Sequence, residues 1–325
     1  MTHAQFQTVI AAALLGVLLS SPPAFERVYG QTPQGTWTIK SPLPAVRAEV
    51  AAVALEGRLH ALGGVFDSAS EPYHDEYNPA TDKWQPATPL PKPRDHLAVA
   101  AANGKVYAVG GFATPVHKDA SNETFEYDPA TKVWRVLPAM NVRRGAAGAA
   151  AVDGKIHVIG GRGPDGVVVA THEVFDPQSG TWIDAAPLPL GRDHLAVIAV
   201  DGKIHAIGGR TGRPADRVDR HDVYHPVSDK WTSAAPLPTP RSGLASAYHL
   251  GLILVLGGEL PPDHTFPENE AYDPKTDRWV TLAPMPHGRH GFGGDTIGNS
   301  AYFAGGSLTP GDGGATDQLL MFQLP

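Results

Sequence analysis

Arginine recurs at one fixed position in this 325-residue chain, always ten residues after a tryptophan. Two further arginines each follow a glycine doublet directly. Planar guanidinium groups bind carboxylate, sulfate and phosphate groups through paired hydrogen bonds, so a convergent set of them predicts an anionic ligand. The candidate ligand-binding arginines are Arg47, Arg94, Arg144, Arg162, Arg192, Arg210, Arg241 and Arg289.

A structural role is the alternative for each of these arginines. At a repeated position, an arginine can tie a loop to backbone carbonyls or to a nearby acid without touching any ligand. The repeat pattern requires arginine less at Arg162 and Arg210 than at the other six positions. These two are therefore the stronger candidates for ligand binding. The acids in the same register are Glu49, Asp95, Asp193 and Glu259. They leave the predicted binding surface with an excess of about four positive charges.

Histidines stand beside these arginines in the sequence. The stretch Arg-Asp-His-Leu-Ala-Val occurs twice and carries His96 and His194. Because imidazole and carboxylate groups can transfer protons near neutral pH, His96, His194 and Glu259 join the candidate ligand-binding residues. Nothing in the sequence selects a proton-transfer group among these three and His290. The catalytic residues are therefore left unknown.

A metal site would need the same residue types. Non-haem iron centres use two histidines and one carboxylate, and Glu49 occupies the register of His96 and His194. These three residues belong to different repeat units, so we expect them to be too far apart to share an ion. His60, His157 and His205 occupy a repeated position where other units have tyrosine, which favours packing in the core. We predict no metal and no other cofactor.

The elements that position these residues are repeated units. The six tryptophans recur about every 48 residues, and a glycine doublet follows each tryptophan after 26 residues. The tryptophans are Trp37, Trp84, Trp134, Trp182, Trp231 and Trp279. The doublets begin at Gly63, Gly110, Gly160, Gly208, Gly257 and Gly305. The copies differ in length only between a doublet and the next tryptophan, and variable loops on a fixed scaffold are the usual place for binding.

The pattern within each unit predicts four short strands. Asp-Gly pairs such as Asp153-Gly154 lie between apolar runs, as in tight β-hairpins. An aromatic, a polar and a proline residue then mark a strand that enters a turn before the tryptophan. The chain ends at the equivalent of this third strand in the sixth unit. We therefore expect the segment 34–40 to pair with the segment 317–323 and close a ring.

These units resemble the kelch repeat, and the resemblance covers residues 31–325. It implies an all-β fold, a six-bladed kelch β-propeller with four antiparallel strands per blade and the last blade closed by the N-terminal strand. It also implies that the recurring arginine begins the strand nearest the central axis. The loops that follow the glycine doublets would share that face. Some kelch proteins that capture acidic peptides carry arginines at both positions.

Composition excludes several classes of protein. The chain has 36 glycines and 31 prolines, which argues against a helical protein. It has no cysteine, which excludes disulfides, thiolate metal sites and a cysteine nucleophile. The net charge of −7 and a pI near 6.1 argue against nucleic acid as a partner.

The first thirty residues are typical of an export signal. An apolar run over 9–20, followed by small residues near position 30, predicts a signal peptide over 1–30 and a periplasmic or secreted protein. That run is too short to span a membrane, and no similar run follows it. The repeats fill residues 31–325, so we expect one propeller domain that acts as a monomer.

Two classes of function follow from these features. The first is a binding module without chemistry, which takes a protein segment or an anionic or carbohydrate ligand on its arginine-lined loop face. The second is an enzyme. Galactose-oxidase-like kelch enzymes need a cysteine cross-linked to a tyrosine, so the absence of cysteine excludes copper radical chemistry. N-acetylneuraminate epimerase, a sialic acid mutarotase, is similar in architecture and implies isomerisation of an acidic sugar as the alternative.

Overall fold

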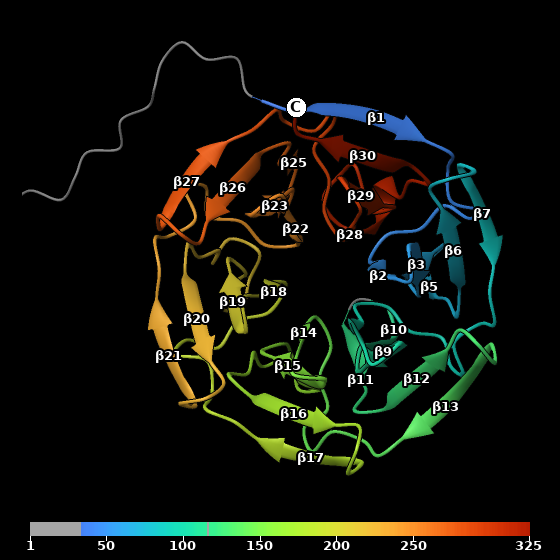
Figure 1. The fold of residues 1–325 in the computed structure, drawn as a ribbon, viewed down its shortest axis with the longest axis vertical. Helices are drawn as coiled ribbons and strands as arrows, with labels where there is room; N and C mark the ends of the chain where they lie inside the picture. The colour runs from blue at the N-terminus through green and yellow to red at the C-terminus, as the bar shows by residue number, and fades with distance from the viewer. Residues whose placement is uncertain (1–33, 116) are drawn as a thin grey trace, which may run out of the picture. The chain divides into compact units, whose positions relative to one another are not determined.

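The computed structural model describes residues 34–115 and 117–325. There the chain forms six four-stranded antiparallel sheets placed around an axis (Figure 1). We number these sheets blades 1 to 6 in chain order. The first strand of each blade lies nearest the axis and the strand with the tryptophan lies outermost. The predicted all-β, six-bladed propeller is confirmed.

The strands of each blade follow one another in the chain, except in blade 6. Blade 1 contains β2 (Ala51–Leu55), β3 (Arg58–Leu62), β6 (His74–Asn78) and β7 (Lys83–Pro86). Blade 2 contains β8 (Ala98–Ala102), β9 (Lys105–Val109), β12 (Thr124–Asp128) and β13 (Val133–Leu137). Blade 3 contains β14 (Gly148–Val152), β15 (Lys155–Ile159), β16 (His172–Asp176) and β17 (Thr181–Asp184).

Blades 4 to 6 repeat this order. Blade 4 contains β18 (Ala196–Val200), β19 (Lys203–Ile207), β20 (His221–His225) and β21 (Lys230–Ser233). Blade 5 contains β22 (Ala245–His249), β23 (Leu252–Leu256), β26 (Asn269–Asp273) and β27 (Arg278–Thr281). Blade 6 contains β28 (Gly293–Ile297), β29 (Ser300–Ala304), β30 (Leu319–Gln323) and β1 (Thr36–Lys40).

The loops that follow the glycine doublets carry small elements of their own. In blades 1, 2 and 5 they form two-stranded sheets, and in blade 6 a short 3-10 helix. These elements are β4 (Val65–Phe66) with β5 (Ala69–Ser70), β10 (Phe112–Thr114) with β11 (Lys118–Ala120), β24 (Glu259–Leu260) with β25 (His264–Thr265), and η1 (Asp312–Gly314).

The N-terminal strand closes the ring. β1 pairs with β30 so that Thr36 lies opposite Gln323 and Lys40 opposite Leu319, which confirms the predicted pairing (Figure 1). The ring of Trp37 packs on Phe322 with centroids 4.8 Å apart. This closure removes the free sheet edges that an open ring would expose.

The tryptophans and the glycine doublets join each blade to its neighbour. All six indole N–H groups donate to a backbone carbonyl of the preceding blade, at 2.8–2.9 Å. The second glycine of each doublet donates its N–H to the carbonyl of the recurring arginine in the next blade, at 2.8–3.1 Å. A Cβ on Gly160 would lie 2.4 Å from the carbonyl oxygen of Arg192, so only glycine permits this contact.

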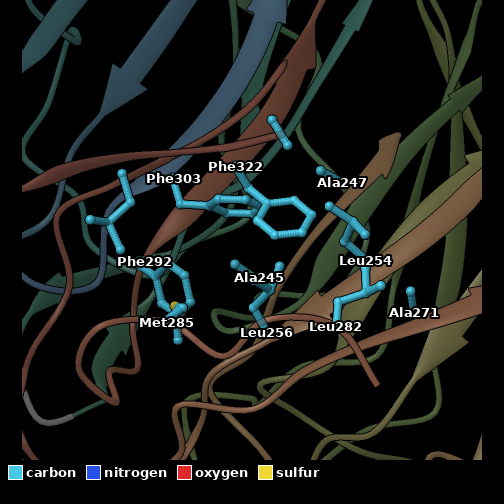
Figure 2. Close-up of a cluster of buried hydrophobic side chains, with 12 residues drawn as sticks. Ala245, Ala247, Leu254, Leu256, Ala271, Leu282, Met285, Phe292, Phe303 and Phe322 are labelled. Atoms are coloured by element: carbon cyan, nitrogen blue, oxygen red, sulfur yellow. The ribbon is translucent and has the colours of Figure 1, made fainter. Parts of the chain in front are cut away.

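The hydrophobic core lies between adjacent blades. Figure 2 shows the cluster between blades 5 and 6, where apolar side chains of the two sheets interlock. Its buried members are Ala245, Ala247, Leu254, Leu256, Ala271, Leu282, Met285, Phe292, Ala301, Phe303, Leu320 and Phe322. Five similar clusters fill the other spaces between blades. The faces of the blades are thus used mainly for apolar packing, and the candidate ligand-binding residues lie near the axis and in the loops.

The predicted signal peptide over 1–30 lies outside the described residues. Among the residues that are described, no helix has the length and apolar character needed to cross a membrane.

Candidate functional site

The six recurring arginines lie in the turns that lead into the innermost strands, and all six are buried. Each binds a side chain in or just before the third strand of its own blade. The pairs are Arg47 with Asp75, Arg94 with Glu123, Arg144 with Glu173, Arg192 with Asp222, Arg241 with Glu270 and Arg289 with Gln318. A ligand role for these six stays a prediction, and their burial and pairing favour the structural alternative.

These pairs change the predicted charge of the loop face. Five of the six partners are carboxylates that the sequence register did not include. Together with the four acids of the sequence register, these five carboxylates make nine acids beside the eight candidate arginines. The predicted excess of positive charge among these residues is therefore wrong. The reason is that each partner lies some 28 to 30 residues further along the chain, two strands away from its arginine.

A closed ring of backbone hydrogen bonds surrounds the axis. It runs through the residues two positions after the recurring arginines, and each N–H donates to the carbonyl of the preceding blade at 2.9–3.4 Å. The ring residues are Glu49, His96, Ala146, His194, Gly243 and Gly291, with the N–H of Val50 closing it onto Gly291. All six ring residues have a positive φ. The ring brings Glu49, His96 and His194 to one level, but among the described residues these three do not form a group whose ligand atoms all lie within 4.8 Å of one another.

Glu49 lies between two histidines. Its carboxylate is 3.0 Å from Nε2 of His96 and 3.4 Å from Nδ1 of His290, and all three side chains are buried. Burial lowers the pKa of His96, but Glu49 and Asp95 outweigh this and hold its pKa at about 9. For His290 burial is likewise outweighed, by Glu49 and Glu259, and its pKa is about 9. The two histidines in turn outweigh burial at Glu49 and hold its pKa well below the usual range.

Arg210 connects this group to the neighbouring loops. Its guanidinium donates to Asp193 and to Glu259, each at 3.1 Å, and its third nitrogen lies 3.1 Å from Nε2 of His194. Burial, together with the charge of Arg210, lowers the pKa of His194 well below its ordinary value. Arg162 donates to the other oxygen of Asp193 at 2.6 Å. Arg162 and Arg210 therefore clamp a single carboxylate between blades 3 and 4.

His117 joins the group from the hairpin of β10 and β11. Its Nε2 lies 3.2 Å from Nε2 of His194, and its ring contacts His96 and Phe112 edge-on or tilted. Burial and the charge of His96 lower the pKa of His117 to about 2. The sequence carries no signal for His117, because this residue stands in a variable loop outside every repeated position.

An axial cavity of about 390 Å³ adjoins the ring. The innermost strands line it mainly with alanine and glycine, among them Ala100, Gly148, Ala199 and Gly293. Glu49, His96 and His194 stand at its ring end. The arrangement can hold and transfer protons near the axis, with small side chains leaving space beside it.

The comparisons with known proteins agree with this fold. The family model described as Kelch motif matches residues 93–141, 143–189, 191–238 and 240–286, and the chain belongs to this family of propeller repeats. A search of curated proteins finds no match. A solved structure described as "Structure of YjhT" is similar over 87% of this chain and 96% of its own, with 17% identity and a TM-score of 0.74. At that identity the likeness supports the fold alone.

Proposed function

We propose that this kelch propeller is a binding module whose loop face takes an anionic ligand, either an acidic sugar or an acidic protein segment. The observation that carries the proposal is a group of arginines in the loop 208–220 of blade 4 and beside it. The side chain of Arg213 is 84% exposed and that of Arg220 is 39% exposed. Arg162 of blade 3 reaches the same loop by donating to the carbonyl of Gly212.

Arg217 supports the same assignment. Its Nε donates to the carbonyl of Pro240, and its guanidinium lies over the ring of Phe266 at 5.8 Å. One of its terminal nitrogens is buried and has no hydrogen-bond partner. Buried donors are nearly always satisfied in folded proteins. A ligand carboxylate or sulfate bound here would accept from this donor. Arg213 and Arg220 belong to the same loop and are bonded to Asp216 and Asp222, so a ligand anion would compete with these two carboxylates for them.

A thermal-shift series tests the proposal. The chain 31–325 would be melted with sialic acid, a uronic acid, a sulfated sugar and an acidic peptide at low and at physiological salt. A ligand at about a hundredfold excess over Kd stabilises the fold by about 2.7 kcal/mol. Arg213→Ala with Arg217→Ala should abolish the shift. Arg135→Ala on the outer strand β13, also an exposed arginine, should retain it.

The proposal fails if none of these probes stabilises the chain at low salt, or if the double variant and the Arg135 control respond alike. An effect that persists unchanged at high salt would also contradict it, because binding through exposed guanidinium groups weakens as salt screens them.

A second function, acid-base isomerisation of an acidic sugar, rests on a different observation. Glu49 lies between His96 and His290, and all three have strongly shifted pKa values beside the axial cavity. Shifted pKa values of this kind gather at catalytic sites. Faster anomeric exchange of a fresh sugar acid in the presence of the protein, lost in Glu49→Gln, would support an enzyme. Binding without exchange would support the module.

We also propose that the chain is exported. The apolar run over 9–20 and the small residues before position 31 support this. Cell fractionation and the mass of the mature chain would test it, and an intact N-terminus on protein retained inside the cell would overturn it.

A further inference from the structure

Three imidazole rings face one another above the backbone ring. His96 and His117 come from blade 2 and His194 from blade 4, and the ring residue between them is Ala146, whose methyl group leaves them room to meet. Their potential ligand nitrogens all lie within 4.8 Å of one another. The Nε2 atoms of His117 and His194 are 3.2 Å apart. Two ligands of one tetrahedral metal ion, each bonded at about 2.0–2.1 Å, lie about 3.3 Å apart.

The orientation of the rings also suits an ion. The three ring planes are inclined to one another by 60°, 77° and 81°, so the rings do not stack. Unstacked rings can approach one ion from different directions. Their side chains are at least partly buried, which limits competition by water.

Carboxylates lie beside the outer nitrogens of two of these histidines. Nδ1 of His96 is hydrogen-bonded to Asp95 at 2.6 Å, and Nδ1 of His194 lies 3.1 Å from Asp193 without forming a hydrogen bond. Nε2 of His194 faces Nε2 of His117, and Nε2 of His96 lies 3.0 Å from the carboxylate of Glu49, likewise without a hydrogen bond. A carboxylate behind a histidine is the usual support of a metal-binding imidazole, because it fixes the tautomer and the ring orientation.

Another group of nearby ligand atoms lacks these properties. His60, His74 and Glu76 are also close together. However, Nδ1 of His74 is bonded to the carbonyl of Thr88 and its Nε2 to His60. Both ring nitrogens of His74 are therefore already hydrogen-bonded within blade 1, and neither is available to bind an ion.

We propose that His96, His117 and His194 bind one divalent transition metal ion of the Zn²⁺ type. Three neutral imidazoles suit Zn²⁺, Co²⁺, Ni²⁺ and Cu²⁺ in preference to Mg²⁺ or Ca²⁺, which take oxygen ligands. This site replaces the sequence-based prediction of no metal, and it is independent of the binding function proposed above.

The charges around the group accommodate an ion. The carboxylate of Glu49, 3.0 Å from Nε2 of His96, offsets its positive charge. Arg210 lies 3.1 Å from Nε2 of His194, but its charge is balanced by Asp193 and Glu259. On metal binding the contact between Arg210 and that nitrogen is lost, and the proton held on His96 is displaced.

The test uses the chain without a polyhistidine tag, stripped of metal by a chelator and titrated with Zn²⁺ in a calorimeter. We expect one Zn²⁺ per chain, and with Co²⁺ the strong visible absorption of a four-coordinate ion. His117→Ala should weaken Zn²⁺ binding about 100-fold or more, since loss even of an outer partner costs 10–100-fold. Lys118→Ala, in the same hairpin and exposed, should bind as the wild type does.

Failure of the wild-type chain to take up one Zn²⁺, or a weak Co²⁺ spectrum typical of six water ligands, would overturn the proposal. So would unchanged binding by His117→Ala. Circular dichroism checks that each variant is folded. If His117→Ala misfolds, His96→Gln tests the same site, because it removes a ligand that lies outside the hairpin. It should also weaken Zn²⁺ binding.

Discussion

Lowering the pH from 7 to 5 should destabilise the propeller through three buried pairs of histidines. Blades 1, 3 and 4 each have one pair, between the second and third strands, at 2.8–3.0 Å. The pairs are His60 with His74, His157 with His172, and His205 with His221. All six side chains are buried, which agrees with the expectation that this repeated position packs in the core.

One histidine of each pair is fixed in its neutral form. Nδ1 of His172 faces the carbonyl of Ala186 at 3.1 Å and must donate to it, so its Nε2 accepts from Nδ1 of His157. A proton added at Nε2 would place two donors face to face. His74 and His221 make the same pair of contacts. Burial lowers their pKa to about 4, and that of His172 to about 3.

The sign and size of the effect follow from these values. A histidine with a lowered pKa in the fold adds stability above its unfolded pKa of about 6.5, and this stability is lost as the pH falls toward the folded pKa. Between pH 7 and 5 the loss is about 2 kcal/mol for one such histidine. The three fixed histidines together should therefore cost about 6 kcal/mol, a large part of the stability of an ordinary domain.

Blade 6 offers a replacement for one pair. At the two equivalent positions it has Tyr302 and Leu319, both buried. The double variant His157→Tyr, His172→Leu copies them into blade 3. Urea unfolding followed by tryptophan fluorescence at pH 7 and pH 5 gives the free energy of unfolding of each chain. We expect the loss between the two pH values to shrink by about 2–4 kcal/mol in the variant, because burial also lowers the pKa of His157, to about 4.

His287→Tyr is the matched control, because His287 is exposed and should leave the pH dependence unchanged. The comparison uses the difference between the two pH values, so a change in packing that acts equally at both cancels. The reasoning would be refuted if the double variant and the wild type lost the same free energy between pH 7 and 5.

Three further perturbations test the contacts that build the propeller. Gly160→Ala should destabilise the propeller by about 3 kcal/mol in urea unfolding. Gly202 has a similar positive φ but no atom within 4 Å of an added Cβ, so Gly202→Ala should cost only about 1 kcal/mol. Equal costs would argue against the close contact at the doublet. Arg144→Ala should cost about 3–5 kcal/mol because it leaves the buried carboxylate of Glu173 without its cationic partner, with only the N–H groups of Asn141 and Val142 beside it. Adding Glu173→Leu should recover part of that loss, and no recovery would show that the ion pair is not the cause. Phe322→Ala, beneath the closing strand, should cost about 3–5 kcal/mol and lower the melting temperature; an unchanged melting temperature would contradict closure by the N-terminal strand.

The number of blades, the four strands in each and the closing strand could all be predicted from the order of the residues. These features could be read because their markers are periodic and local. A tryptophan or a glycine doublet has the same role in every copy, and each donates a hydrogen bond to a backbone carbonyl of the blade beside it. Trp37 near the start and Phe322 near the end could therefore be paired without knowledge of the other contacts.

Which candidate site residues come into contact depends on the packing of the blades and could not be predicted from the repeats. The recurring arginines turned out to be paired with acids two strands away, as Arg144 is with Glu173, because the sheet register brings those positions together across the blade. His117 reached His194 only because a variable hairpin folds over the axis. Such contacts depend on how the blades are rotated about the axis and on the room left at Ala146, and neither has a periodic signal in the chain.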